Sequence, residues 1–203
     1  MINIRRKVPV FAALALAFTL SMPAFGAEAQ TFVEGTHKSL TELVTNAKSS
    51  ADQSKLDQAF DAAFDYDSLA KSTLPDWDKR SPAERDQFTA VLKDLVRNAY
   101  RRNLKKTLGY KVDYVAEEDA GGGSAKVVRT TAKNSKNIRE EPVSIDYLVH
   151  QVNGKFQIFD IVTEGSSLAR NYRNQFRKLI EKHSFEELLK RMKAKRDKGG
   201  EAG

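Results

Sequence analysis

The stretch PVSIDYLVHQVNGKFQIFDIVT, residues 142–163, decides the fold. Apolar and polar residues alternate on both sides of Asn153-Gly154, and an Asn-Gly pair between two such segments is the strongest local signal for a two-residue β-hairpin turn. The turn sets the register of the two strands. The expected opposing pairs are Gln151 with Phe156, Val149 with Ile158, Tyr147 with Asp160, and Ile145 with Val162.

Both faces of this predicted hairpin carry apolar residues. The longer apolar row consists of Val143, Ile145, Tyr147, Val149, Phe156, Ile158 and Val162. The other face still carries Leu148, Phe159 and Ile161, whereas an antiparallel sheet with one face in water is largely polar on that face. Helices are therefore expected to cover part of this second face.

A second hairpin precedes the first. Residues 110–116 alternate with a period of two, Gly121-Gly122-Gly123-Ser124 provides a turn, and residues 125–132 return as a strand. Two hairpins in series predict a four-stranded antiparallel meander.

Helical spacing marks the remainder of the chain. Ser81-Pro82-Ala83-Glu84 combines an N-cap, a proline at the first helical position and a capping box, so it starts a helix that runs to about residue 107. Further helices are expected at about residues 32–48, 54–64, 67–74 and 168–182, and from residue 184 onward. The predicted class is α+β, with the four-stranded sheet packed against several helices.

Residues 1–26 have the pattern of a cleaved signal peptide. Arg5, Arg6 and Lys7 precede the apolar run 8–20, and small residues permit cleavage after Gly26 or Ala29. A membrane anchor is the alternative, but the run is shorter than the ~20 residues that span a bilayer. Because the chain has no Cys, it has no lipoprotein anchor, disulfide or thiolate metal site. We therefore expect an exported, soluble protein.

The formal net charge of +7 is concentrated at the two ends of the sequence. The signal peptide and residues 190–203 account for all of it, and residues 27–189 carry equal numbers of basic and acidic side chains. General nucleic-acid binding requires a basic face on the folded domain, so no nucleic-acid partner is expected. The predicted organisation is a signal peptide (1–26), a folded domain (27–190) and a basic, disordered tail (191–203).

No set of residues in the sequence forms a recognisable catalytic or metal site. His37, His150 and His183 have no second ligand at metal-binding spacing and are interpreted as surface or capping residues. Ser166 and Ser167 lie outside a Gly-x-Ser-x-Gly motif and are interpreted as helix caps. The acidic run 117–119 does not have the spacing of a calcium loop. We expect no enzyme activity and no cofactor.

Asp160 needs a separate explanation, because the register places it on the apolar face. A buried carboxylate must be hydrogen-bonded or neutral. The structural interpretation is a partnership with the Tyr147 hydroxyl or with Arg170 or Arg173, and the functional alternative is a polar mark at the mouth of a cavity.

The run Asp146–Leu168, continued by Asn171-Tyr172-Arg173-Asn174-Gln175-Phe176, closely resembles the MlaC family of periplasmic phospholipid-binding proteins, also known as toluene-tolerance proteins. The segment Phe64–Ala70, together with Trp77, Pro82, Phe88 and Tyr100, fits the same family in the same order. The resemblance covers nearly the whole chain after the signal peptide.

The resemblance implies a periplasmic phospholipid carrier, with an apolar lipid cavity between the sheet and the helices. It also implies two partners, an outer-membrane lipoprotein complex and an inner-membrane ABC transporter complex, and a role in outer-membrane lipid asymmetry. The expected cavity residues are Val112, Tyr114, Ile145, Tyr147, Val149, Phe156 and Ile158 from the sheet, and Leu69, Trp77, Leu92, Val96, Tyr100, Tyr172 and Phe176 from the helices. Asp160, Asn171 and Arg173 are candidates for the cavity mouth.

Three alternatives stay open at this point. The cargo could be a polycyclic lipid such as a hopanoid, or the protein could be a periplasmic interaction factor with a filled core. The basic tail could also bind a membrane or a polyanion as an accessory role.

Overall fold

The computed structural model describes residues 28–121 and 124–200, so the predicted signal peptide lies outside the described residues. The elements in chain order are α1 (Glu28–Asn46), α2 (Ser50–Ala63), α3 (Tyr66–Thr73), the 3₁₀ helix η1 (Trp77–Lys79), α4 (Pro82–Lys106), β1 (Tyr110–Asp119), β2 (Lys126–Asn134), β3 (Val143–Val152), β4 (Lys155–Thr163), β5 (Ser166–Ser167), α5 (Leu168–Lys182) and α6 (Phe185–Gly200). The predicted α+β class is confirmed.

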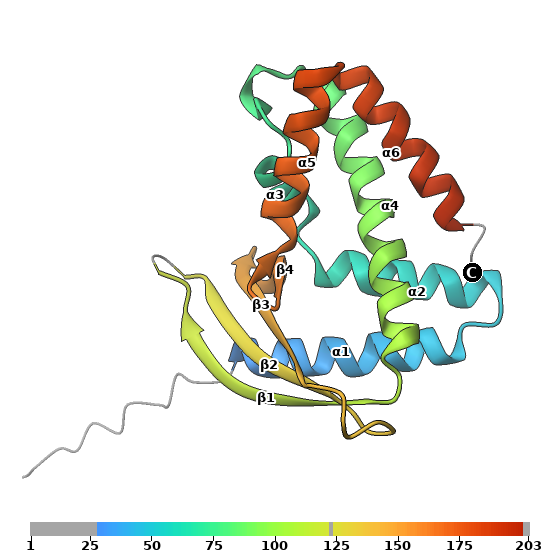
Figure 1. Cartoon of the computed structure of the whole chain (residues 1–203), viewed down its shortest axis with the longest axis vertical. Helices are drawn as coiled ribbons and strands as arrows, with labels where there is room; N and C mark the ends of the chain where they lie inside the picture. Colours follow the sequence, from blue (N-terminus) through green and yellow to red (C-terminus); the bar gives the residue numbers. More distant parts are fainter. Residues whose placement is uncertain (1–27, 122–123, 201–203) are drawn as a thin grey trace, which may run out of the picture.

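The sheet is an open antiparallel meander in the order β1-β2-β3-β4-β5. It has five strands where four were predicted, because the short β5 pairs with the end of β4. The sheet is curved, α1 packs against β1 and β2, and α4 rises from the end of the sheet where its last turn leads into β1 (Figure 1). Helix α5 leads away from the sheet, and α6 returns alongside α4.

The turn that decided the register forms as predicted. Asn153 and Gly154 have positive φ angles of 50° and 76°, the backbone of the hairpin turn that an Asn-Gly pair favours. Near the turn the expected pairs are present, with Val149 opposite Ile158 and Gln151 opposite Phe156.

Further from the turn the predicted register is wrong. A β-bulge beside Leu148 and Val149 shifts the pairing, so Tyr147 lies opposite Ile161 and Asp160 lies opposite Leu148. A bulge adds one unpaired residue to one strand and thereby changes which residues share a face beyond it. Ile161 therefore joins the face of Tyr147, and Asp160 leaves it.

The second face of the β3–β4 hairpin meets the beginning of helix α3. Asp65, the N-cap of α3, lies 2.8 Å from His150 Nε2 through its Oδ2 atom. The His150 ring also packs against Phe159, with ring centroids 4.7 Å apart. His150 is thus a structural contact between sheet and helix.

The helices pack around a core between α3, α4 and α5. Phe88 and Phe176 meet edge to face with centroids 5.5 Å apart, and Tyr172 stacks on Phe176 at 5.3 Å. Helix α4 begins at the predicted capping box, in which the Ser81 and Glu84 side chains each bond the other residue's backbone N–H. The capping box fixes where this 25-residue helix begins, and its buried residues include Phe88, Leu92 and Val96.

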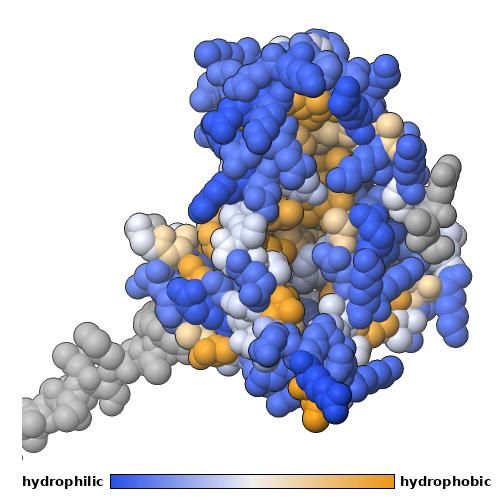
Figure 2. All heavy atoms as spheres, in the orientation of Figure 1, coloured by the Kyte–Doolittle hydropathy of each residue, from blue (hydrophilic) through white to orange (hydrophobic). Residues whose placement is uncertain are grey.

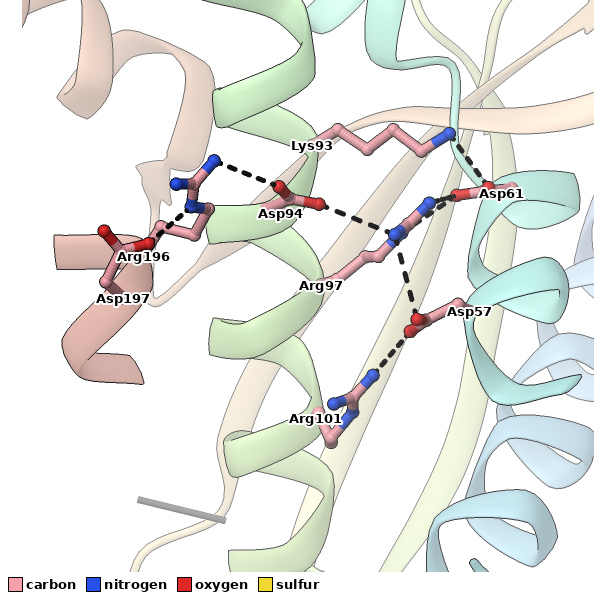
Figure 3. A network of polar contacts seen from close by, with 8 residues as sticks. All are labelled: Asp57, Asp61, Lys93, Asp94, Arg97, Arg101, Arg196 and Asp197. Atoms are coloured by element: carbon pink, nitrogen blue, oxygen red, sulfur yellow. Dashed lines mark hydrogen bonds and ion pairs between the residues drawn. The ribbon is translucent and has the colours of Figure 1, made fainter. Parts of the chain in front are cut away.

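A network of ion pairs connects α4 with α2 on one side and with α6 on the other (Figure 3). Arg97 on α4 lies 2.5 Å from Asp61 on α2, and Arg101 lies 2.5 Å from Asp57. On the other side of α4, Arg196 of α6 lies 3.9 Å from Asp94. The network joins three helices that are distant in sequence.

The predicted disordered tail differs from the structure. Helix α6 continues to Gly200, and the side chain of Met192 is only 4% exposed within it. Met192 follows Phe185, Leu188 and Leu189 at helical spacing, and all four side chains are buried. The basic residues from 190 onward therefore lie on the outer side of a helix whose other side is buried.

Candidate functional site

An apolar cavity of about 410 Å³ lies between α4, the sheet and the first turn of α5. Its size is within the range of ~300–1,000 Å³ that is usual for small-molecule sites. Figure 2 shows apolar surface at the floor of a hollow on this side of the molecule. The lining residues are His37, Val96, Ala99, Tyr100, Asn103, Leu104, Thr107, Tyr110, Val112, Ala132, Ile145, Tyr147, Ile161, Thr163, Ser166, Leu168, Asn171 and Tyr172.

One stripe of α4 forms the helical wall of the cavity. Its members, residues 96, 99, 100, 103, 104 and 107, recur every three or four positions and so point in one direction. The stripe continues the buried core residues Phe88, Leu92 and Leu95 toward the sheet. The same helix face is therefore core at one end and cavity wall at the other.

The opposite wall is one face of the sheet. Cross-strand neighbours stand side by side on it: Val112 pairs with Ala132, Tyr147 with Ile161, and Ile145 with Thr163. Paired positions in antiparallel strands share a face, so these pairs form a continuous surface. The bulge in β4 is what brings Ile161 and Thr163 into it.

The mouth of the cavity is marked by its exposed lining residues, Asn103, Thr163, Ser166 and Asn171. All four are polar and uncharged. Asn171 Nδ2 donates a hydrogen bond to Ser166 Oγ at 2.8 Å, which links β5 to the first turn of α5. Among the described residues, no Asp, Glu, Lys or Arg lines the cavity.

The titratable groups of the cavity are neutral near pH 7. Burial lowers the pKa of the His37 imidazole below its ordinary value, and His37 Nδ1 lies 3.3 Å from the Tyr114 hydroxyl. Burial also raises the pKa of Tyr100 and of Tyr147, so both keep their protons. An apolar, uncharged cavity suits hydrocarbon chains, since a buried charge without a partner is costly.

The structure brings together part of the predicted cavity set. Val96, Tyr100, Val112, Ile145, Tyr147 and Tyr172 line the cavity, and Asn171 lies at its mouth. The other predicted lining residues, Leu69, Trp77, Leu92, Tyr114, Val149, Phe156, Ile158 and Phe176, are in the core or pack against it.

Two examples show why these residues lie outside the cavity. Val149 and Ile158 oppose each other near the turn and are 0% and 1% exposed, so neighbouring side chains already fill the space over them. Trp77 belongs to η1, where the Arg85 guanidinium lies over its ring at 5.5 Å.

Asp160 and Arg173, the other candidates for the mouth, have structural partners instead. Asp160 accepts hydrogen bonds from Ser167 Oγ at 2.6 Å, Ala169 N at 2.9 Å and Ile161 N at 2.8 Å. The expected partnership of Asp160 with Tyr147 or an arginine is therefore wrong. Arg173 Nη1 donates to the carbonyl oxygen of Ser72 in α3 at 3.0 Å.

Sequence reasoning missed several lining residues for identifiable reasons. Ala99 and Leu104 belong to the α4 stripe and were detectable from helical spacing alone. Ile161 was assigned to the wrong face because an ideal register has no bulge, and Thr163, which lies opposite Ile145 for the same reason, was not considered. The remaining residues outside the prediction are His37, Asn103, Thr107, Tyr110, Ala132, Ser166 and Leu168.

Two further observations concern the described residues only. No group of His, Cys, Asp and Glu side chains in residues 28–121 and 124–200 is arranged to hold a metal ion. In the same ranges, no helix combines the length and the apolar character needed to cross a membrane.

Comparison with known proteins agrees with this architecture. A phospholipid-binding protein from Ralstonia solanacearum, solved in complex with a phospholipid at 1.53 Å resolution, superposes with a TM-score of 0.68 at 22% sequence identity, over 86% of this chain and 98% of the other. That similarity establishes the fold. No curated protein sequence matches the chain. The family model described as MlaC protein matches residues 34–194, and the chain belongs to the MlaC family.

Proposed function

We propose that this protein is a periplasmic carrier that holds the acyl chains of a phospholipid in the cavity between α4 and the sheet. The observation that carries the proposal is the cavity itself: it measures about 410 Å³, it opens at a polar mouth, and no Asp, Glu, Lys or Arg among the described residues lines it. Family membership and the fold shared with a phospholipid-binding protein support the same assignment.

The polar mouth and the apolar interior match the two parts of a phospholipid. Tyr147, Ile161 and Leu104 provide surface for hydrocarbon, while Asn103, Ser166 and Asn171 stand where a head group would meet water. Tail binding of this kind depends on apolar area and shape, and it requires no reacting group. We accordingly propose no enzyme activity, in keeping with the use of Ser167 as the N-cap of α5.

A carrier is needed because a phospholipid leaves a bilayer at great cost. Two chains of about sixteen carbons, at ~0.8 kcal/mol per methylene, cost roughly 25 kcal/mol to expose to water. A protein that crosses an aqueous space with the chains enclosed removes most of that cost. We propose that the two ends of the route are an outer-membrane lipoprotein complex and an inner-membrane ABC transporter complex, as the family resemblance implies.

The test is lipid extraction from the full-length protein after export to the periplasm, followed by mass spectrometry. We expect diacyl phospholipid in amounts comparable to the protein. A polycyclic lipid in its place would change the cargo but keep the carrier. Protein that emerges free of lipid, and that does not move labelled phospholipid between donor and acceptor vesicles, would show that the cavity serves another purpose.

A further inference from the structure

The two C-terminal helices carry the positive charge of the folded protein. Eleven Lys and Arg residues and four Asp and Glu residues lie between Leu168 and Gly200, a net charge of +7. Between Glu28 and Ser167 there are twenty basic and twenty-two acidic residues, a net charge of −2. Since α6 packs along α4 and α5, this charge belongs to one structured surface, which we call the α5–α6 hairpin (Leu168–Gly200).

Most of this charge has no partner of opposite sign. The exposed side chains Arg170, Arg173, Arg177, Lys178 and Lys182 of α5 form no ion pair within the described part of the chain. Three of them, at positions 170, 173 and 177, follow one another along one side of the helix. On α6, Lys193, Lys195 and Lys198 are likewise exposed and in no ion pair among the described residues.

The hairpin also lacks the apolar surface of a protein interface. The large apolar side chains that are exposed in the described residues are Leu108, Val115 and Ile138, and none of them lies on α5 or α6. Protein–protein interfaces have an apolar, uncharged centre, whereas a surface on which eleven Arg and Lys residues outnumber four Asp and Glu residues matches phosphate groups. These features favour an anionic lipid surface over a protein.

We propose that the α5–α6 hairpin docks the protein reversibly on an anionic phospholipid surface. The proposal rests on the proposed function in one respect: α5 also borders the cavity through Leu168, Asn171 and Tyr172. Docking through α5 therefore brings the cavity mouth near lipid head groups. Each basic side chain near an anionic surface strengthens the attraction between protein and membrane. At 0.1 M salt this attraction is screened within ~10 Å, so the protein can leave the membrane without a conformational change.

The test measures binding of the full-length mature protein to vesicles of phosphatidylglycerol mixed with phosphatidylcholine, at low and at physiological salt. Neutralising three charges on α5, Arg177→Gln with Lys178→Gln and Lys182→Gln, should weaken binding roughly a hundredfold, at about fivefold for each charge. The matched control is Lys38→Gln with Lys48→Gln and Lys55→Gln, three exposed lysines on or beside α1 and α2. The vesicle affinity of this control variant should stay within about threefold of that of the unmodified protein.

The outcomes separate this proposal from its alternatives. Equal losses in both triple variants would overturn it, because net charge alone would then govern binding. The docking proposal also fails if the unmodified protein does not bind anionic vesicles at low salt. If the purified protein nevertheless contains phospholipid, the proposed carrier function is unaffected by that result. Vesicle binding that survives neutralisation of α5, while a complex with an acidic protein is lost, would assign the hairpin to a protein partner. Circular dichroism of each variant verifies that the fold is retained.

Discussion

At the scale of single residues, Asp160 ties the first turn of α5 to the sheet. Its carboxylate accepts from the hydroxyl of Ser167, which is the N-cap of α5, and from the backbone N–H of Ala169. Three donors converge on one side chain that is only 9% exposed. Asp160 thereby fixes where α5 leaves the sheet, and with it the side of the cavity mouth formed by Asn171.

Replacement of Asp160 tests this role. Asp160→Asn keeps the size of the side chain but turns an amide group toward donors, so we expect a loss of about 1–3 kcal/mol in the free energy of unfolding. Asp119→Asn is the control, because Asp119 is exposed and its ion pair with Lys126 is worth little. Urea denaturation measures both. Equal stability of the two variants would mean that Asp160 does not anchor α5.

His37 makes the stability of the protein depend on pH. Burial lowers its pKa below 6.5 in the folded state, so below pH 6.5 the unfolded state binds more protons than the folded state. The free energy of unfolding should therefore fall as the pH drops from 7 to 5, and above pH 6.5 this contribution should vanish. His37→Gln, which can still bond the Tyr114 hydroxyl, should flatten the decline in thermal unfolding. An unchanged slope would exclude His37 as its source.

At the scale of elements, sequence patterns located the helices and strands well because their causes are local. The Asn153-Gly154 turn and the Ser81 capping box act within a few residues, and both are present in the structure. The bulge in β4 was not predictable in the same way, because alternation assumes an unbroken strand. Ile161, Val162 and Asp160 were placed on the wrong faces for that single reason, since Val162 lies opposite Asp146 and not opposite Ile145.

The length of the C-terminal helix was predicted too short, because its many basic residues obscure the helical spacing of its apolar residues. Six basic residues between Lys190 and Lys198 suggested a disordered tail, yet Met192 continues the buried row of Leu188 and Leu189. Met192→Ala should lower the free energy of unfolding by about 2–4 kcal/mol, the usual cost of truncating a buried side chain. The neighbouring Lys193→Ala should change it by less than about 0.5 kcal/mol. Equal free energies of unfolding for the two variants in chemical denaturation would indicate that the segment is disordered.

At the scale of the whole molecule, the cavity results from incomplete packing between two well-defined layers. Val96 and Tyr100 on α4 and Val112, Ile145 and Tyr147 on the sheet were expected to line the cavity, and all five do. Which apolar residues pack together and which border empty space depends on how the layers are spaced. Leu92 and Ile158 have the same chemistry as the lining residues, so no residue type distinguishes core from cavity.

The most direct test of the carrier assignment fills the cavity from one wall. Ala99 lines it and is half-buried, so Ala99→Trp places an indole ring where an acyl chain would lie, while Ala83→Trp adds the same ring at an exposed position at the start of α4. Native mass spectrometry of protein exported to the periplasm measures the fraction that carries a phospholipid. We predict high occupancy for the unmodified protein and for Ala83→Trp, and a loss of most bound lipid for Ala99→Trp with the fold retained. Equal occupancy in all three proteins would contradict the placement of the lipid in this cavity.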